Sequence, residues 1–340
     1  MGLMGLLRFG CTAFCPTVVS SSSEVYEKVL PLLKRRKGSA TGGAEILGAH
    51  LEGPFISVLK KGAHNQSVFK VAKNGIADFD KTYGAELKKG SQTVSIITIA
   101  PELEGACDAI PDLVSRGITV AMGHSACRIA EAEKAVTKGA NSITHLFNAM
   151  QAFHHRDPGL VGVLGASDLP SPEKKSRYPK SSVSSPNRSE LDPRPFYGLI
   201  CDGVHVHPNS IRIAYCSHPS GAVLVTDTLS AMGLPKGVYV LGGKEVEVDE
   251  KGGAYVKGTK TLAGSTITID QCIRNFQKFT NCSLVEAIEA ATLHPAQMLG
   301  IDHRKGTLNA GADADFVFLD DSSGEVYVKR VFVAGEEVQL

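Results

Sequence analysis

Four side chains able to bind a metal ion or carry a proton each follow a short apolar run of this 340-residue sequence. Glu52 ends the run that begins at Ile46, and it precedes a Gly-Pro turn. The other three are His124 after the run 119–123, His145 after 141–144 and Asp227 after 222–226. Such runs are typical of buried strands, and the carboxyl ends of parallel barrel strands meet at one face. We therefore expect the four side chains to form one site.

Glu52, His124 and His145 are ligands of the types that hold Zn²⁺ or a similar divalent ion. A catalytic site keeps a further position open for water, whose pKa falls from about 15.7 to about 7 when it is bound. Asp227 would take the proton of that water and pass it to a leaving nitrogen. A carboxylate suits this role because the neighbouring cation holds its pKa low. The pattern thus predicts metal-dependent hydrolysis.

Each of these residues has a simpler explanation when it is taken alone. A single histidine after a strand is usually a hydrogen-bonded surface or core residue, and an aspartate there is often a helix cap. Spacing cannot prove that the side chains converge, because they are far apart in the sequence. Four residues of suitable type at strand ends favour a site, whereas one would not.

The elements that must position these residues alternate between strands and helices. The strand over 94–100 precedes a helix over 102–116, and the strand that leads to His124 precedes a helix over 128–138. This order is typical of parallel βαβ units. We therefore expect the α/β class with a TIM-like (β/α)8 barrel. Further elements are expected at 11–16 and 197–203 (strands), and at 1–10, 24–33, 78–89, 209 onward, 265–279 and 283–293 (helices).

Composition suggests one barrel with smaller additions. We expect residues 1–300 to form the barrel, with a hairpin segment at 236–260, and residues 301–340 to supply strands of a small β-sandwich domain. The stretch 167–195 is rich in Ser, Pro and Lys, which predicts a disordered insertion. It interrupts the alternation of strands and helices.

Charge and cysteine content exclude several classes of protein. The net charge is +1, from 36 basic and 35 acidic residues, so neither a nucleic-acid nor a membrane partner is expected. No apolar run of about 18 residues could span a membrane. The eight cysteines form no CxxC pair, which is typical of reduced thiols in a cytoplasmic enzyme.

The sequence resembles the N-acetylglucosamine-6-phosphate deacetylases of the amidohydrolase superfamily in a series of motifs. These are HLEGPF at 50–55, KKGAH at 60–64, GHS at 123–125, THLFNAM at 144–150, HRDPG at 155–159, DGVH at 202–205, TD at 226–227 and GTKTLAGS at 258–265. The match follows the order of the chain over nearly its whole length, apart from the stretch 167–195.

The resemblance implies hydrolysis of the acetamide of N-acetyl-D-glucosamine 6-phosphate to glucosamine 6-phosphate and acetate, in amino-sugar catabolism. Glu52, His124 and His145 match the family's metal ligands, and Asp227 matches its general base and acid. His64 matches a histidine thought to help polarise the acetyl carbonyl. The family's sugar-phosphate contacts fall on Ala63, Asn148, Ala149, Arg156, Asp202, Gly203, Val204, His205, Leu262, Ala263 and Gly264.

The same resemblance implies one divalent ion per subunit. Zinc is our first choice, with iron, cobalt or manganese as alternatives. It also implies a homodimer in which Arg156 reaches the neighbouring site. Exposed backbone N–H groups around Asn148 and Ala149, together with Arg156, could bind the phosphate.

The sequence departs from the family at its start. It begins inside the helix that follows the family's first barrel strand, so we expect a barrel without that strand. Two alternatives follow. One is a truncated, non-catalytic form that binds ligand or pairs with a full-length subunit, and the other is a deacetylase of a related N-acyl sugar phosphate.

Overall fold

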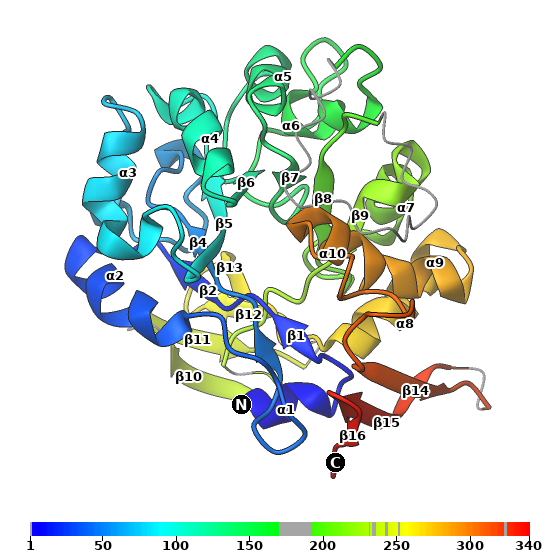
Figure 1. Ribbon diagram of the computed structural model, residues 1–340. Coiled ribbons are helices and arrows are strands. Elements are labelled where there is room, and N and C mark those ends of the chain that lie inside the picture. Colours follow the sequence, from blue (N-terminus) through cyan, green and yellow to red (C-terminus); the bar gives the residue numbers. More distant parts are fainter. Residues whose placement is uncertain are drawn as a thin grey trace.

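The computed structural model describes residues 2–169, 192–230, 232, 236–241, 244–250, 252–322 and 325–340. Its centre is a curved, entirely parallel sheet of seven strands in the order β2-β4-β5-β6-β7-β8-β9 (Figure 1). The strands are β2 (Thr17–Val19), β4 (Ala49–Glu52), β5 (Val94–Ile99), β6 (Thr119–Met122), β7 (Ser142–Ile143), β8 (Phe196–Leu199) and β9 (Ala222–Leu224). Because all seven are parallel, their carboxyl ends lie along one edge of the sheet.

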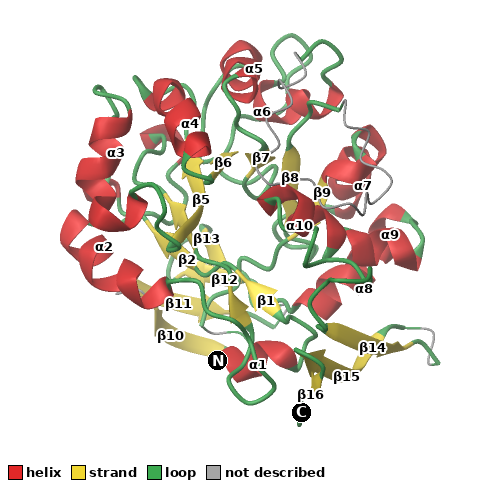
Figure 2. Ribbon diagram, in the orientation of Figure 1, coloured by secondary structure: helices red, strands yellow, loops and turns green. Residues whose placement is uncertain are grey.

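Helices surround the outer face of this sheet (Figure 2). They are α2 (Ser23–Val29), α3 (Ile76–Tyr83), α4 (Ala106–Ser115), α5 (Ile129–Thr137), α6 (Gly159–Gly162), α7 (Pro208–Ser217), α8 (Ile269–Thr280), α9 (Leu284–Glu289) and α10 (Leu293–Leu299). Helix α4 shows why, since Ala106, Ala109, Ile110 and Leu113 recur at helical spacing and are all buried in the main core. Short 3-10 helices occur at 30–33, 58–60, 66–68, 84–87, 163–165 and 219–221.

In the part of the chain that the structure describes, three smaller sheets accompany the parallel one. A four-stranded antiparallel sheet holds β10 (Gly237–Leu241), β11 (Lys244–Val248), β12 (Ala254–Val256) and β13 (Leu262–Gly264). A second antiparallel sheet holds β14 (Phe316–Asp320), β15 (Tyr327–Val333) and β16 (Glu336–Glu337), and a two-stranded parallel sheet pairs β1 (Ala13–Phe14) with β3 (Glu45–Ile46). Helix α1 (Leu3–Leu7) packs beside β15, because Leu7, Val331 and Val333 share one buried cluster. The two chain ends are therefore neighbours (Figure 1).

The predicted TIM-like architecture with a small β appendage is confirmed. Within the described residues, neither β2 nor β9 has a second neighbour, so the curved sheet remains open between them. The strand expected over 11–16 forms only as β1, outside the curved sheet, and the barrel strand starts after Pro16. The domain division at residue 300 stays a prediction, and residues 170–191 of the expected insertion lie outside the described residues.

None of the helices in the described part of the chain has both the length and the apolar character that crossing a membrane requires.

Candidate metal centre and active site

The four predicted residues all lie at the carboxyl edge of the parallel sheet. Glu52 is the last residue of β4, and His124, His145 and Asp227 follow closely after β6, β7 and β9. His124, His145 and Asp227 have positive φ angles of 47°, 27° and 45°. Few non-glycine residues adopt this left-handed backbone, and strain of this kind is concentrated at functional sites. The packing around these turns must therefore stabilise a strained backbone at the three residues.

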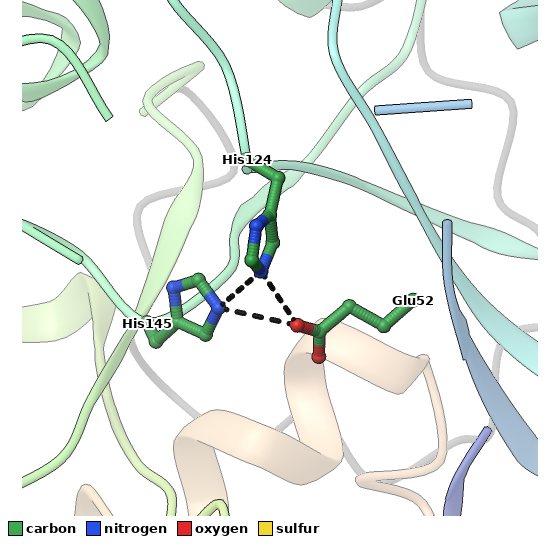
Figure 3. A group of neighbouring side chains, drawn as sticks. All are labelled: Glu52, His124 and His145. Carbon is green, nitrogen blue, oxygen red and sulfur yellow. Dashed lines mark hydrogen bonds and ion pairs between the residues drawn. The ribbon is translucent and has the colours of Figure 1, made fainter. Parts of the chain in front are cut away.

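Three potential ligand atoms converge here, as Figure 3 shows. Glu52 Oε1 lies 2.8 Å from His124 Nε2 and 3.3 Å from His145 Nε2, and the two Nε2 atoms are 3.1 Å apart. All three side chains are buried. His124 Nδ1 must donate its proton to the Lys60 carbonyl at 2.8 Å, which leaves the lone pair of Nε2 facing the other two residues. This donor set fits a divalent cation.

The electrostatics of these side chains point the same way. Burial alone would raise the pKa of Glu52, but its close contacts with His124, His145 and His64 hold that pKa well below its usual value. Burial would also lower the pKa of His145, but the hydrogen bond to Glu52 and its charge raise that pKa to about 9. Burial dominates at His124 and lowers its pKa. The site thus holds an ionised carboxylate and one extra proton, which a cation can replace.

Asp227 lies close to this cluster. Burial raises the pKa of its carboxyl group first, and the charge of Glu52 raises it further, while His145, His205 and His64 act in the opposite direction. A bridge between Thr228 and Ser265 places β13 beside it. A carboxylate with a raised pKa next to a cation site can accept a proton and release it again.

The sequence prediction overlooked Ser20, which directly follows β2. His64 was predicted, and its Nε2 lies 3.3 Å from Glu52 Oε1. Its other nitrogen, Nδ1, lies 2.8 Å from the hydroxyl of Ser20 and 3.3 Å from the backbone nitrogen of Ser20. The only sequence signal for Ser20 is its place directly after β2, at the edge where the other site residues lie.

A hydrogen-bonded polar layer below the three ligands was also overlooked. His50 Nε2 lies 2.7 Å from Thr98 Oγ1, which lies 2.6 Å from Thr144 Oγ1. Gly123 allows this contact across β6, because a Cβ there would lie 2.8 Å from the Thr144 Cβ and 3.1 Å from the Thr98 Cγ2. The layer links His50, two residues before Glu52 on β4, to Thr144, which directly precedes His145.

Asp202 is one of the predicted substrate contacts. Its carboxylate accepts hydrogen bonds from residues of the same turn. It accepts hydrogen bonds from the backbone N–H groups of Val204 and His205, both at 2.8 Å, and from His205 Nδ1 at 2.6 Å. These bonds lower its pKa, although burial acts the other way. Asp202 therefore orients the His205 ring through its Nδ1.

The remaining predicted contacts lie in loops and on β13. The backbone N–H of Asn148 donates to the His145 carbonyl at 3.0 Å, whereas Ala149 has a positive φ of 49°. Arg156 is exposed, and within the described residues its guanidinium group has no ion-pair partner. On β13, Gly264 has a φ of 148°, and a Cβ there would lie 3.1 Å from the Asp227 carbonyl oxygen. The other positions are Ala63, Gly203, Val204, Leu262 and Ala263, none of which is buried.

A second group of carboxylates, Glu45, Asp313 and Asp315, has cations already in place. Lys305 Nζ lies 2.8 Å from Glu45 and 3.1 Å from Asp313, and it also pairs with Asp315. Arg304 pairs with Glu45 and Asp313. This group is an ion-pair network.

Comparison with known proteins identifies the family. Residues 2–338 match the model of the amidohydrolase family, whose members generally use a divalent metal. The N-acetylglucosamine-6-phosphate deacetylase of Danio rerio is 46% identical over 334 residues, which are 98% of this chain and 75% of that protein.

Solved structures give the same result. The deacetylase of that name from Thermotoga maritima superposes with a TM-score of 0.78 at 30% identity, covering 99% of this chain and 81% of that one. A mutant enzyme from Mycobacterium smegmatis in complex with N-acetyl-D-glucosamine-6-phosphate has a TM-score of 0.76 at 30% identity, covering 98% and 79%. The chain therefore belongs to the amidohydrolase family, among its N-acetylglucosamine-6-phosphate deacetylases.

Proposed function

We propose that this chain hydrolyses the acetamide of N-acetyl-D-glucosamine 6-phosphate to glucosamine 6-phosphate and acetate. The convergence of Glu52 Oε1, His124 Nε2 and His145 Nε2 within 3.3 Å carries the proposal, because so compact a donor set suits a divalent cation. Its position at the carboxyl edge of the sheet is where barrel enzymes carry their active sites. The identity of the substrate is inferred from the names of the relatives given above.

Glu52, His124 and His145 would hold one divalent ion, with zinc as the first choice. Such an ion activates water for attack and polarises a carbonyl group. Asp227 takes the proton of the attacking water while the water oxygen bonds to the acetyl carbon. The C–N bond then breaks, and Asp227 returns the proton to the leaving nitrogen, so that acetate and a free amine result. His64, whose Nε2 lies 3.3 Å from Glu52 Oε1, helps to polarise the acetyl oxygen.

The sugar phosphate would lie among the loops that follow β7 and β8 and against β13. His205, held by Asp202, presents its Nε2, and Ala149 together with Arg156 provides donors for the phosphate. Ala63, Asn148, Gly203, Val204, Leu262, Ala263 and Gly264 would complete the pocket. All eight cysteines are free thiols, which agrees with the proposed cytoplasmic location.

The test is acetate release by the full chain. The purified protein is stripped of metal, reloaded with Zn²⁺, Fe²⁺, Co²⁺ or Mn²⁺, and assayed with N-acetylglucosamine 6-phosphate. N-acetylgalactosamine 6-phosphate and unphosphorylated N-acetylglucosamine are the comparison substrates. We expect one bound ion per chain, loss of activity on chelation, and fastest turnover of the phosphorylated gluco sugar. A folded, metal-loaded chain that releases no acetate would refute the proposal.

A further inference from the structure

The hydrogen bonds of Ser20 define which nitrogen of His64 carries a proton. The backbone N–H of Ser20 points at His64 Nδ1 over 3.3 Å, and the Ser20 hydroxyl lies 2.8 Å from the same atom. A backbone N–H can only donate, so Nδ1 must accept. In a neutral imidazole the proton is then on Nε2. The Ser20 hydroxyl is much closer to Nδ1 than to the Glu52 carbonyl oxygen, which is 3.4 Å away, so its single proton also points at Nδ1.

The protonated nitrogen faces the metal centre. His64 Nε2 lies 3.3 Å from Glu52 Oε1, and the His64 side chain is only 7% exposed. An N–H group at this position donates a hydrogen bond and has no lone pair with which to bind a cation. His64 is therefore close enough to the ligands to be mistaken for one, but its hydrogen bonds give it a different role.

His124 shows the opposite arrangement in the adjacent ring. The two rings pack edge to face with their centroids 4.5 Å apart. Nδ1 of His124 faces the Lys60 carbonyl, which can only accept, so its proton is on Nδ1 and its Nε2 is free to bind a metal. One backbone N–H and one backbone carbonyl thus give neighbouring histidines opposite tautomers.

We propose that Ser20 is a positioning residue that fixes His64 as an Nε2–H donor aimed at the oxygen of an N-acyl carbonyl, and so excludes it from the metal ligands. The proposal rests on the proposed function for the identity of that acceptor. It limits the protein ligands at the centre to three and leaves the remaining positions for water and substrate.

Nitrogen NMR of the histidine-labelled chain tests the tautomer without any assay of activity. Spectra are recorded near pH 8, and His64→Gln identifies the His64 signals. We expect Nδ1 of His64 to resonate as an unprotonated nitrogen and Nε2 as a protonated one. Adding Zn²⁺ should shift the signals of His124 and His145 and leave the proton on His64 Nε2. A proton on Nδ1, or its loss from Nε2 with Zn²⁺, would overturn the proposal.

Variants of the serine pair test the role of the hydroxyl. Ser20→Ala should lower kcat about tenfold or more while zinc stoichiometry stays at one, as is usual when a group that orients a catalytic histidine is lost. Ser20→Thr retains the hydroxyl and should restore most of the rate. Ser21→Ala is the matched control, since that neighbouring hydroxyl donates to the Val19 carbonyl at 2.9 Å.

The outcomes separate this inference from the proposed function. An active wild type with an equally active Ser20→Ala variant would overturn the role of Ser20 and leave the function standing. A folded wild type with the expected tautomer but no acetate release would refute the function and leave the tautomer assignment. If Ser20→Ala fails to fold, the wild-type spectra and the Ser20→Thr variant still decide the case.

Discussion

The site depends on where single protons lie in a cluster of three histidines and one carboxylate. His124 has its Nδ1 proton on the Lys60 carbonyl, and His64 has its Nδ1 facing the Ser20 N–H. His145 differs from both, because its buried Nδ1 has no hydrogen-bond partner among the described residues. Its protonation is therefore governed by Glu52 and by whatever cation replaces the proton between them.

This arrangement predicts that metal binding releases a proton from His145. The pKa of His145 is raised to about 9 in the metal-free chain, so the ring is charged at pH 7.5. A cation bound at Nε2 must displace that proton, so the apparent metal affinity should rise about tenfold per pH unit from pH 7 and level off above pH 9. Calorimetry in buffers of different ionisation enthalpy counts the protons. Release of none at pH 7.5 would contradict the assignment of His145 as a ligand.

Substitution of Asp227 should separate proton transfer from metal binding. An amide at this position keeps the shape of the side chain but cannot take the proton of the attacking water. We expect Asp227→Asn to lower kcat by about 10²–10⁴-fold, with one metal ion still bound. Acetate release and elemental analysis measure the two effects. The exposed control Asp112→Asn should behave as wild type, and an Asp227→Asn variant with most of its activity would remove the assigned role.

At the level of secondary structure, the sequence predicted most of what positions the site. The runs before Glu52, His124, His145 and Asp227 form β4, β6, β7 and β9, and all four side chains reach one edge. This prediction worked because the carboxyl ends of parallel strands share an edge whatever the length of the connecting segments. Even β7, which has only two residues, places His145 at this edge.

The parts that sequence reasoning missed depend on contacts between distant strands. Pro16 lies between β1 and β2. The sequence predicted a single strand over 11–16, and it therefore missed β2, the three-residue strand directly before Ser20. The hydroxyl of Ser20 meets a ring 44 positions away, and the Thr98 and Thr144 hydroxyls meet across a strand that lies between theirs. No local sequence pattern predicts such pairs. They depend on how neighbouring strands are aligned and, for the two threonines, on the space that Gly123 leaves between them.

Gly123 offers a test of that packing between strands. A methyl group at this position would lie 2.8 Å from the Thr144 Cβ and 3.1 Å from the Thr98 Cγ2. We expect Gly123→Ala to force Thr144 aside, lower the free energy of unfolding by about 1–3 kcal/mol, and weaken metal binding through His145. Urea unfolding and metal titration measure the two effects.

Gly165→Ala is the matched control, because a Cβ there would meet nothing within 4 Å. That variant should keep both the stability and the metal affinity of the wild type. Equal behaviour of the two variants would mean that the polar layer does not position the ligands.

On the scale of the whole molecule, an ion-pair network joins segments from the two ends of the chain. Glu45 on β3 is buried and pairs with Arg304 and Lys305, which also pair with Asp313 and Asp315 near β14. We expect Glu45→Gln to lower the free energy of unfolding by about 3 kcal/mol at pH 7, because both cations lose a buried partner. Glu337→Gln removes an exposed pair with Arg330 and should change stability little.

The pH dependence of this effect has a definite sign. Burial alone would raise the pKa of Glu45, but hydrogen bonds from Arg304 and Lys305 lower it below 4.5. A carboxyl group with a lowered pKa in the folded state stabilises the protein above its ordinary pKa and loses that effect as the pH falls. Urea unfolding should therefore show the difference between wild type and Glu45→Gln shrinking below about pH 4.5. A difference that is constant from pH 7 to pH 3 would exclude the ion pairs as its source.

The family resemblance implies a homodimer in which Arg156 reaches the neighbouring site, and this expectation predicts complementation between variants. Arg156→Ala should raise KM for the phosphorylated sugar much more than for the unphosphorylated one, since a guanidinium group pairs with phosphate, and the exposed Arg8→Ala is the control. If Arg156 serves the partner's site, a hybrid of Arg156→Ala and Asp227→Asn subunits contains one intact site. That site has its own Asp227 and receives Arg156 from the other subunit.

At a substrate concentration where neither variant alone turns over at a measurable rate, random exchange of their subunits should restore about a quarter of wild-type activity, because half of the dimers are hybrids with one working site of two. The measurement is acetate release after the two proteins are unfolded together and refolded, at a substrate concentration well below KM. An arginine that acts within its own subunit gives no recovery, because each hybrid site then lacks one group. Recovery would require both a dimer and a site shared across it, whereas a monomer in sedimentation would remove the predicted homodimer.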